Sequence, residues 1–201
     1  MEQAVVMIHE FARPEAERDP IIIACQQGDR ESFHLLFEKH KDRVYSIALH
    51  FSGNAATAHD IAQQVFLKLL SNIGKFNWQS DFNTWLYRMV ANVCFDEQRR
   101  WRRLIPFGEA QEVMVMQTSE NIEASYQRIE LAEVVRGAIC KLKPKLRLPI
   151  LLKYIEGMSY EEIAQVLDCS IGTVASRLNR GHKALAQKLG HLRKSLERED
   201  V

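Results

Sequence analysis

The sequence predicts an all-α protein with two small helical domains joined by a flexible acidic linker. Apolar residues recur at the three- and four-residue spacing of amphipathic helices, and the alternation typical of β-strands is absent. Glycines and prolines mark the joints between these periodic runs, at Gly28, Gly53, Gly74, Pro106, Gly108, Pro144 and Gly157. The helical period fades after Trp101 and returns near Ile122, and residues 104–125 carry four glutamates and no basic residue.

These breaks define the expected domains. We expect an N-terminal domain at 21–103, an acidic linker at 104–126 and a C-terminal domain at 127–192. Residues 1–20 form an extension to which we assign no role, and residues 193–201 form a tail.

The N-terminal domain begins with a helix whose expected N-cap is Asp29. Its apolar side carries Phe33, Leu36, Phe37, Val44 and Ile47. Gly53 and Asn54 end this helix, and the stretch AHDIAQQVFLKLLSNI at 58–73 forms the next one.

The second helix has an unusual solvent face. Its buried stripe is formed by Ala58, Ile61, Ala62, Val65, Leu69 and Ile73. The opposite face carries Asp60, Gln63, Gln64, Leu67 and Ser71. A leucine among acidic and amide groups indicates a protein partner, although isolated surface leucines are common.

A third helix is expected to begin near Phe82, within the stretch KFNWQSDFNTWLYRMVANVCFDEQRRWRR at 75–103. Its core stripe is formed by Phe82, Leu86, Met89, Val90 and Val93, and its polar face by Arg88, Asn92 and Arg99. The polar loop at 77–81 contains Trp78. Aromatic and arginine side chains beside a polar loop suit unstacked bases. Trp78 is therefore either a base-stacking residue or a core residue, whereas Trp85 follows the apolar stripe and belongs to the core.

The C-terminal domain contains the stretch SYEEIAQVLDCSIGTVASRLNRG at 159–181, which predicts a helix-turn-helix. Ser159 and Glu162 have capping-box spacing, and Ser170 is the expected cap of the second helix. Its buried face is expected to hold Ile171, Val174, Leu178, Leu185 and Leu189. Its opposite face carries Thr173, Ser176, Arg177 and Arg180, which suit a DNA major groove. The alternative is a solvated amphipathic helix with ordinary surface arginines.

Charge is segregated along the chain. The net charge is only +1, but residues 141–198 carry 12 basic against 5 acidic residues, and residues 88–103 carry 5 against 2. Nucleic-acid binding must therefore come from local basic surfaces.

Other classes of protein have little support in the sequence. The four cysteines form no CxxC pair, which favours a reducing cytoplasm, and Cys94 and Cys169 are expected in the core. We expect no metal, no cofactor, no membrane insertion and no catalytic residues, because no motif for any of them is present.

Taken in order, the quoted stretches and LKPKLRLPILLKYIEGMSYEEIAQVLDCSIGTVASRLNRG resemble the extracytoplasmic-function sigma factors of bacterial RNA polymerase, over about residues 25–190. The resemblance implies that the C-terminal domain binds the minus-35 element and the N-terminal domain recognises and helps open the minus-ten element. The implied minus-35 contacts are Thr173, Ser176, Arg177, Arg180 and Lys183. The implied minus-ten contacts are Asn77, Trp78, Ser80, Arg88, Asn92, Arg99 and Arg100. The implied contacts with the clamp of core polymerase are Asp60, Gln63, Gln64 and Leu67.

The resemblance also implies further partners. They are the polymerase flap and an inhibitory anti-sigma factor, in a stress or envelope response. The alternative is a transcriptional regulator that binds operator DNA by its helix-turn-helix without acting as a polymerase subunit.

Overall fold

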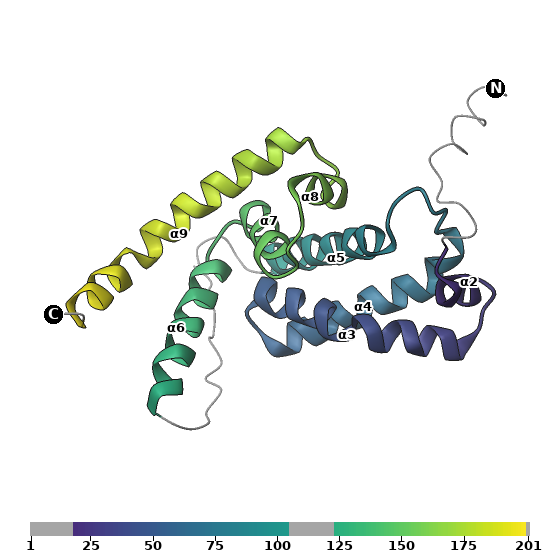
Figure 1. Ribbon diagram of the computed structural model, residues 1–201, viewed down its shortest axis with the longest axis horizontal. Helices are drawn as coiled ribbons and strands as arrows, with labels where there is room; N and C mark the ends of the chain where they lie inside the picture. Colours follow the sequence, from purple (N-terminus) through teal and green to yellow (C-terminus); the bar gives the residue numbers. More distant parts are fainter. Residues whose placement is uncertain (1–17, 105–122, 200–201) are drawn as a thin grey trace.

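The computed structural model describes residues 18–104 and 123–199, and every regular element in these ranges is a helix (Figure 1). The elements are α2 (Pro20–Gln26), α3 (Arg30–Ser52), α4 (Ala55–Asn72), the 3-10 helix η2 (Ile73–Lys75), α5 (Phe82–Leu104), α6 (Glu123–Cys140), α7 (Pro144–Tyr154), α8 (Tyr160–Val166) and α9 (Ile171–Glu199). Most of the predicted linker and of the N-terminal extension lies outside the described residues. Helix α6 begins within the last residues assigned to the linker, and α9 continues through the expected tail to Glu199.

Side-chain caps fix where the helices begin. The Asp29 carboxylate accepts a hydrogen bond from the Ser32 amide at 2.9 Å, as predicted. Ser159 and Glu162 form the predicted capping box, with bonds of 3.1 and 2.7 Å. Each cap satisfies an amide that has no partner within its own helix.

The N-terminal half is built around α3, which packs against α2, α4 and α5. The predicted stripe of α4 is buried, apart from Ala62, which is half-buried. Gln26 ties α2 to the chain after α4, because its amide donates to the carbonyls of Ile73 at 3.1 Å and Phe76 at 2.7 Å. These hydrogen bonds fix the residues that precede the 77–81 loop against α2.

In the C-terminal half, α9 packs across α7 and α8. Val174 and Leu178 are buried on the predicted face of α9. Ile171 was expected on the same face, but it is 47% exposed. It is the first residue of the helix, and the packing of this face begins one turn later, at Val174.

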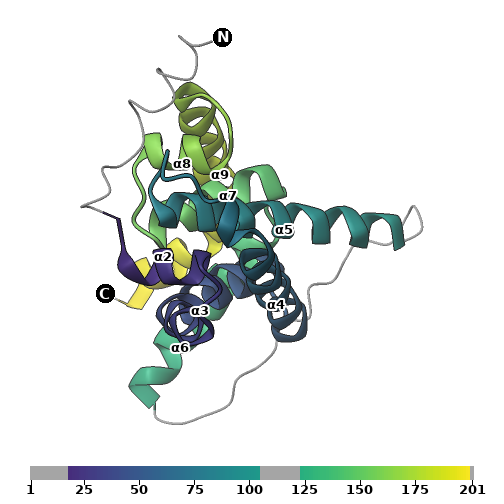
Figure 2. The same ribbon diagram turned by 90° about the vertical axis from the view of Figure 1, so that its right-hand side faces the viewer.

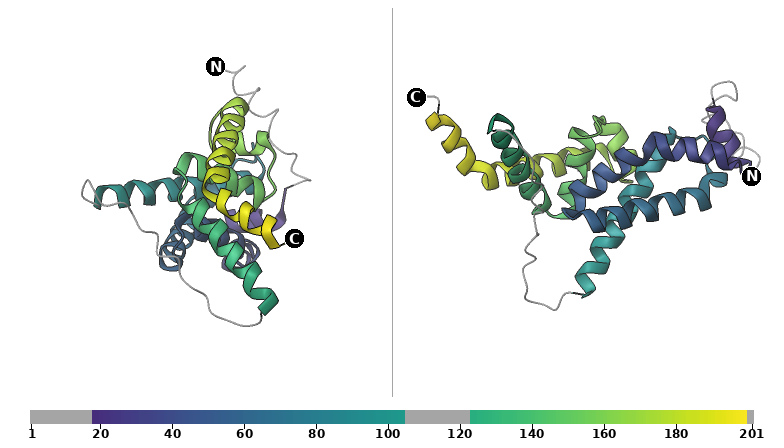
Figure 3. Two further views of the ribbon diagram at one scale, coloured as in Figure 1. Left: turned by 90° about the vertical axis from the view of Figure 1, so that its left-hand side faces the viewer. Right: turned by 90° about the horizontal axis from the view of Figure 1, so that it is seen from below.

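The two halves pack directly against each other. Helix α5 lies against α7 and α8, and α3 lies against α6 and α7. In Figure 2, α7 and α8 lie close to the first turns of α5, while its C-terminal end projects away from the body. Helix α6 and α9 meet on the side away from α2 (Figure 3). Buried apolar side chains of both halves form one continuous cluster.

Gly181 allows α9 to pass close to α7. A Cβ at this position would lie 2.5 Å from Ile150 Cδ1, which is buried. We expect Gly181→Ala to lower the free energy of unfolding by about 1 kcal/mol, because the overpacking cost of about 1–3 kcal/mol exceeds the gain in helix propensity of about 1 kcal/mol. Urea unfolding followed by circular dichroism measures the change.

Gly190→Ala is the matched control in the same helix, because nothing lies within 4 Å of its added Cβ. It should raise stability by up to about 1 kcal/mol. When Ile150→Val is added to Gly181→Ala, it removes the methyl group that clashes with the new Cβ. The double variant should therefore be more stable than the sum of the two single effects. Equal stability of the two alanine variants would contradict the close approach.

Candidate nucleic-acid interface and partner-binding face

The predicted DNA-reading face of α9 begins at a well-defined helix start. Ser170 Oγ accepts a hydrogen bond from the Thr173 amide at 3.2 Å and so caps the helix as predicted. Ser176, Arg180 and Lys183 are exposed, and Thr173 and Arg177 are half-buried. The face therefore combines hydroxyl and guanidinium donors on a rigid helix.

The two arginines of this face are held along the helix surface. Arg180 donates to the Ser176 carbonyl at 3.2 Å, and Arg177 lies 3.6 Å from the Cys169 sulfur. Among the side chains that the structure describes, neither arginine forms an ion pair with a carboxylate. Both charges thus remain available to phosphate or to base edges.

A basic groove of about 970 Å³ joins this face to α5 and to the α6–α7 turn. Eight basic side chains line it, and its lining includes no acidic residue. They are Arg99, Arg102, Lys141, Lys143, Lys145, Arg177, Arg180 and Lys188. The structure thus brings one predicted minus-ten residue, Arg99, beside three predicted minus-35 residues, Thr173, Arg177 and Arg180.

The remaining minus-ten residues lie on α5 and on the loop before it. Asn77 is exposed, and its amide donates to Gln79 Oε1 at 2.9 Å. Ser80 is half-buried, and Asn92 is exposed. The loop therefore presents a pair of mutually bonded amides to solvent.

The three predicted minus-ten arginines of α5 have partners. Arg88 Nη2 donates to the Gln165 carbonyl of α8 at 2.7 Å. Arg99 bonds Asp96 on the preceding turn, and Arg100 lies 3.9 Å from Glu97. The bond from Arg88 crosses between the two halves of the chain.

Trp78 belongs to the core. It is 8% exposed, and its ring centroid lies 4.9 Å from that of Phe76, with the Arg18 guanidinium 5.6 Å from the ring. Its φ of 62° lies in the left-handed region, a conformation that bulky side chains rarely adopt and that packing must offset. Of the two roles that the sequence allowed for Trp78, the structure therefore shows the core position.

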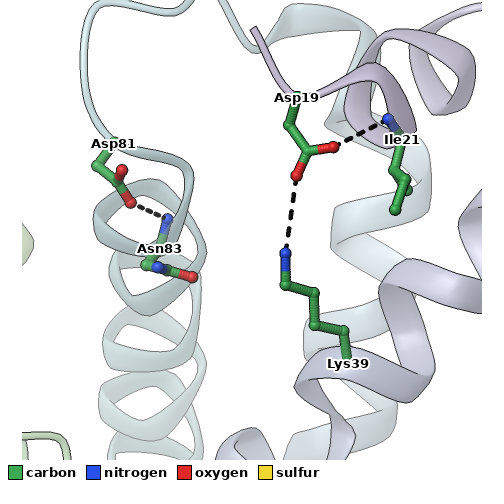
Figure 4. A network of polar contacts seen from close by, with 5 residues as sticks. All are labelled: Asp19, Ile21, Lys39, Asp81 and Asn83. Atoms are coloured by element: carbon green, nitrogen blue, oxygen red, sulfur yellow. Dashed lines mark hydrogen bonds and ion pairs between the residues drawn. The ribbon is translucent and has the colours of Figure 1, made fainter. Parts of the chain in front are cut away.

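A small polar pocket of about 170 Å³ lies beside the loop. In Figure 4, the Asp19 carboxylate accepts from the Ile21 amide at 2.9 Å and lies 3.7 Å from Lys39 Nζ, while Asp81 accepts from the Asn83 amide at 2.8 Å. These carboxylates cap the starts of α2 and α5 and so position the two walls of the pocket.

His40 also lines this pocket and is 4% exposed. Its Nδ1 is buried without a hydrogen-bond partner in the described part of the chain. Burial, together with the positive charges of Lys39 and Arg43, lowers the pKa of His40 to about 4. His40 is thus neutral at physiological pH.

The predicted partner face of α4 borders an apolar groove. Leu67 is 56% exposed, as predicted, and Leu70 beside it is 55% exposed. Together with Gln63 they line a groove of about 530 Å³. Its other walls come from aromatic residues of α3 and α4, namely Phe33, Phe37, Tyr45 and Phe66. Asp60 and Gln64 lie outside the lining.

Three further observations concern metal-ligating groups, membrane-spanning helices and the cysteines. Within residues 18–104 and 123–199, no group of three or more metal-ligating side chains comes together. No helix in the same ranges is both long and apolar enough to span a membrane. Cys94 is buried, as predicted, and its burial raises the pKa of its thiol, whereas Cys169 is only half-buried.

The geometry defines a helix-turn-helix protein with a second arginine-bearing surface. Comparison with known proteins narrows this class. Residues 36–104 match the model of sigma-70 region 2, and residues 132–185 match that of sigma-70 region 4.

Similar proteins give the same result over most of the chain. The ECF RNA polymerase sigma factor SigW of Bacillus subtilis is 31% identical over 83% of this chain and 94% of its own. The RNA polymerase sigma-H factor of Pseudomonas aeruginosa is 32% identical over 84% and 92%, and the ECF sigma-E factor of Escherichia coli K12 is 30% identical over the same shares. The chain therefore belongs to the extracytoplasmic-function sigma factors, and it is an RNA polymerase sigma factor.

Solved structures share the fold. CnrH in complex with the cytosolic domain of CnrY gives a TM-score of 0.64 at 24% identity, covering 85% of this chain and 96% of that one. The sigma factor RpoE of Bartonella quintana, in complex with the anti-sigma factor NepR, gives 0.60 at 21%, covering 80% and 98%. The family is not one of enzymes, and the alternative of an operator-binding regulator is not favoured.

Sequence reasoning did not identify three features of these surfaces. Leu70 was not assigned to the partner face, although it follows Leu67 by three residues. The three lysines around the α6–α7 turn were counted only as charge. His40 was not singled out, because it stands in the charged run EKHKDR, where a solvent-exposed position is the default.

The low pKa of His40 makes stability depend on pH. Its proton is bound in the unfolded chain, with a pKa near 6.5, but not in the fold, so stability is full above pH 6.5 and falls as the pH drops towards 4. We expect a loss of about 2 kcal/mol between about pH 7 and pH 5, measured by urea unfolding.

His40→Leu should abolish this part of the pH dependence. His34→Leu is the control, because His34 is exposed on the same helix, and it should leave the slope unchanged. If His40→Leu keeps the wild-type slope, other groups cause the pH dependence.

Proposed function

We propose that this sigma factor binds core RNA polymerase and directs it to promoters by contacting both the minus-35 and the minus-ten elements. The observation that carries the proposal is the presence of two DNA-suited surfaces, one on α9 and one on α5 with the loop before it, and one exposed apolar face on a single chain. A regulator that only occupies an operator needs the first surface alone. A sigma factor needs all three.

For the minus-35 element, α9 enters the major groove. Thr173, Ser176, Arg177, Arg180 and Lys183 supply the contacts. Arg177 lies nearer the helix start and is placed to read a base, because recognition helices contact base edges with their N-terminal residues. Arg180, one turn further on and exposed, is placed to hold phosphate.

For the minus-ten element, the 77–81 loop meets the melted strand. Asn77 and Ser80 present polar groups, and Arg88, Asn92, Arg99 and Arg100 follow along α5 to hold the backbone. Amide side chains can bond the edges of unstacked bases. With Trp78 in the core, the loop contributes hydrogen bonds and shape rather than stacking.

For the polymerase, the face of α4 docks on the clamp. Asp60, Gln63, Gln64 and Leu67 provide its polar and apolar contacts, and Leu70 extends it. An exposed leucine pair beside an aromatic groove is typical of a protein interface, since it leaves apolar surface in water in the free chain. The C-terminal half docks on the flap.

An anti-sigma factor is a further proposed partner. RpoE and CnrH, whose folds this chain shares, were solved in complex with NepR and with the cytosolic domain of CnrY. We place the protein in the cytoplasm, in a stress or envelope response.

The exposed leucine tests polymerase binding. Leu67→Asp should reduce capture of core polymerase at least about tenfold, because it places a charge in an apolar contact, while helicity stays unchanged. Pull-down of purified core by tagged variants measures the loss, and promoter-directed transcription should fall in parallel.

Leu35→Asp is the matched control. Leu35 is 52% exposed on α3 and does not line the groove. It should bind core like the wild type. Full core binding by folded Leu67→Asp would refute the assignment of this face.

Alanine substitution of Arg177 and of Arg180 should change binding to minus-35 DNA in different ways. Arg177→Ala should cost about 1–3 kcal/mol on the preferred minus-35 element and relax selectivity at one base pair. Arg180→Ala should weaken all sequences alike and lower the salt slope by about one unit.

Transcription by the reconstituted polymerase from a panel of minus-35 variants separates these outcomes. A uniform loss for Arg177→Ala would reassign that residue to phosphate. If neither variant affects transcription, α9 is not the reading helix.

A further inference from the structure

We propose that the basic groove between α5, the α6–α7 turn and α9 is a binding site for single-stranded nucleic acid in the free protein. This role goes beyond the proposed function, because it needs neither polymerase nor a promoter. The groove has a volume of about 970 Å³, and its lining includes eight basic side chains and no acidic one. Three of them, Arg99, Arg177 and Arg180, belong to the proposed promoter contacts. The other five have no assigned role, and they are Arg102, Lys141, Lys143, Lys145 and Lys188.

These five side chains are exposed, and none of them forms an ion pair within residues 18–104 and 123–199. Lysines elsewhere on the surface do have carboxylate partners. Lys41 lies 2.7 Å from Glu38, and Lys68 lies 3.6 Å from Asp96. The groove therefore gathers cations without carboxylates to neutralise them. Like charges held close together repel each other, and a bound polyanion removes that cost.

The spacing of the positive charges indicates the kind of polyanion. The lining residues of α9 run from Thr173 to Lys188, a rise of about 22 Å at about 1.5 Å per residue. Eight cations along this length match about one negative charge every 3 Å. A nucleic-acid strand carries one phosphate per about 3.4 Å. An extended peptide, at about 3.3–3.6 Å per residue, would reach this density only if nearly every side chain were acidic.

Other lining groups suit bases. Phe95 and Gln98 of α5 add a half-buried aromatic ring and a half-buried amide. Bases stack on aromatic rings, and amides hydrogen-bond to their edges. An unpaired strand exposes these faces and edges, whereas a duplex uses them for stacking and pairing. The groove therefore favours an unpaired strand over a duplex.

The groove is distinct from the surface proposed for the melted minus-ten element. No residue of the 77–81 loop lines it, and Arg99 is the one proposed minus-ten residue that does. Substitutions at the five unassigned cations can therefore test the groove without changing any proposed promoter contact.

Fluorescence anisotropy of the free full-length chain tests the proposal. The probes are labelled oligothymidylate and oligouridylate of about 12 nucleotides, within the range of about 4–16 that single-strand sites cover. The test variants are Lys145→Glu in α7 and Lys188→Glu in α9, which reverse one charge in each of two elements that line the groove.

Arg30→Glu is the matched control, because it makes the same change of charge outside the groove. Arg30 is exposed in the first turn of α3, as Lys145 is in the first turn of α7. A carboxylate is favourable near a helix start, so both variants should fold.

We expect the wild type to bind both probes, and the tighter of the two identifies RNA or DNA as the source of the strand. Each test variant should weaken binding at least about fivefold, and the slope of log K against log salt should fall by about 0.7 for each lost phosphate contact. The double variant should combine the two losses. Arg30→Glu should match the wild type.

A wild type that binds neither probe would overturn the proposal, as would unchanged affinity in both test variants or an equal loss in Arg30→Glu. A non-promoter duplex that binds as tightly and loses affinity in the same variants would make the groove a duplex site instead. A polyglutamate peptide of equal charge that displaces the probe equally well would make it a peptide site.

Circular dichroism checks the folding of each variant. If a test variant loses helicity, Lys145→Gln and Lys188→Gln take its place, and unchanged salt slopes in both would overturn the proposal. Failure of the proposed function would appear separately, as an absence of promoter-directed transcripts with core polymerase, because the binding assay contains neither polymerase nor promoter.

Discussion

The guanidinium of Arg147 lies at the junction of the two halves, 8% exposed, and burial lowers the pKa of Arg147. Such a charge is costly to bury unless hydrogen bonds replace its water. Here the carbonyls of Phe51, Cys140 and Leu142 accept from it, the last at 2.9 Å. Phe51 and Cys140 lie in the last turns of α3 and α6, where helix carbonyls lack partners and the helix dipole is negative. One cation therefore satisfies the ends of two helices and fixes where α7 begins.

The packing of the other helices of the C-terminal half follows from this contact of Arg147 with the ends of α3 and α6. With α7 fixed against α3, helix α8 packs on α5 and α9 crosses above α7. The basic residues of α5, of the α6–α7 turn and of α9 then line one groove. A chain with a net charge of only +1 thus concentrates eight basic side chains in one place. The apolar groove of α3 and α4 lies outside this junction, so the partner-binding face does not depend on how the halves meet.

Much of the helical structure could be predicted from the sequence, because helix periodicity and helix capping depend on residues that are close together in the chain. Asp29, Ser159 with Glu162, and Ser170 cap the helices as expected, and α5 begins at the expected Phe82. The exposure of Leu67 also followed from its position opposite the apolar stripe.

The features that could not be predicted are those that depend on distant contacts. The left-handed backbone of Trp78, which turns its ring into the core, has no signature in a bulky residue. The period of a helix shows which face is apolar, but not which helix covers it, so the packing between the halves was not foreseen. Arg147 did carry a signal that sequence reasoning missed, since it interrupts the apolar run LRLPILL. An arginine in such a run is either solvent-facing or a buried cation with carbonyl partners.

The residues that hold the two halves together and the residues proposed to contact DNA are largely different. Tyr87, Glu156 and Arg147 contact the opposite half without belonging to either proposed DNA surface, and only Arg88 belongs to both sets. The packing between the halves and the proposed DNA surfaces therefore depend on different side chains. A substitution at Glu156 or Arg147 changes how the halves meet and leaves every proposed DNA contact in place, whereas a substitution at Arg88 changes both.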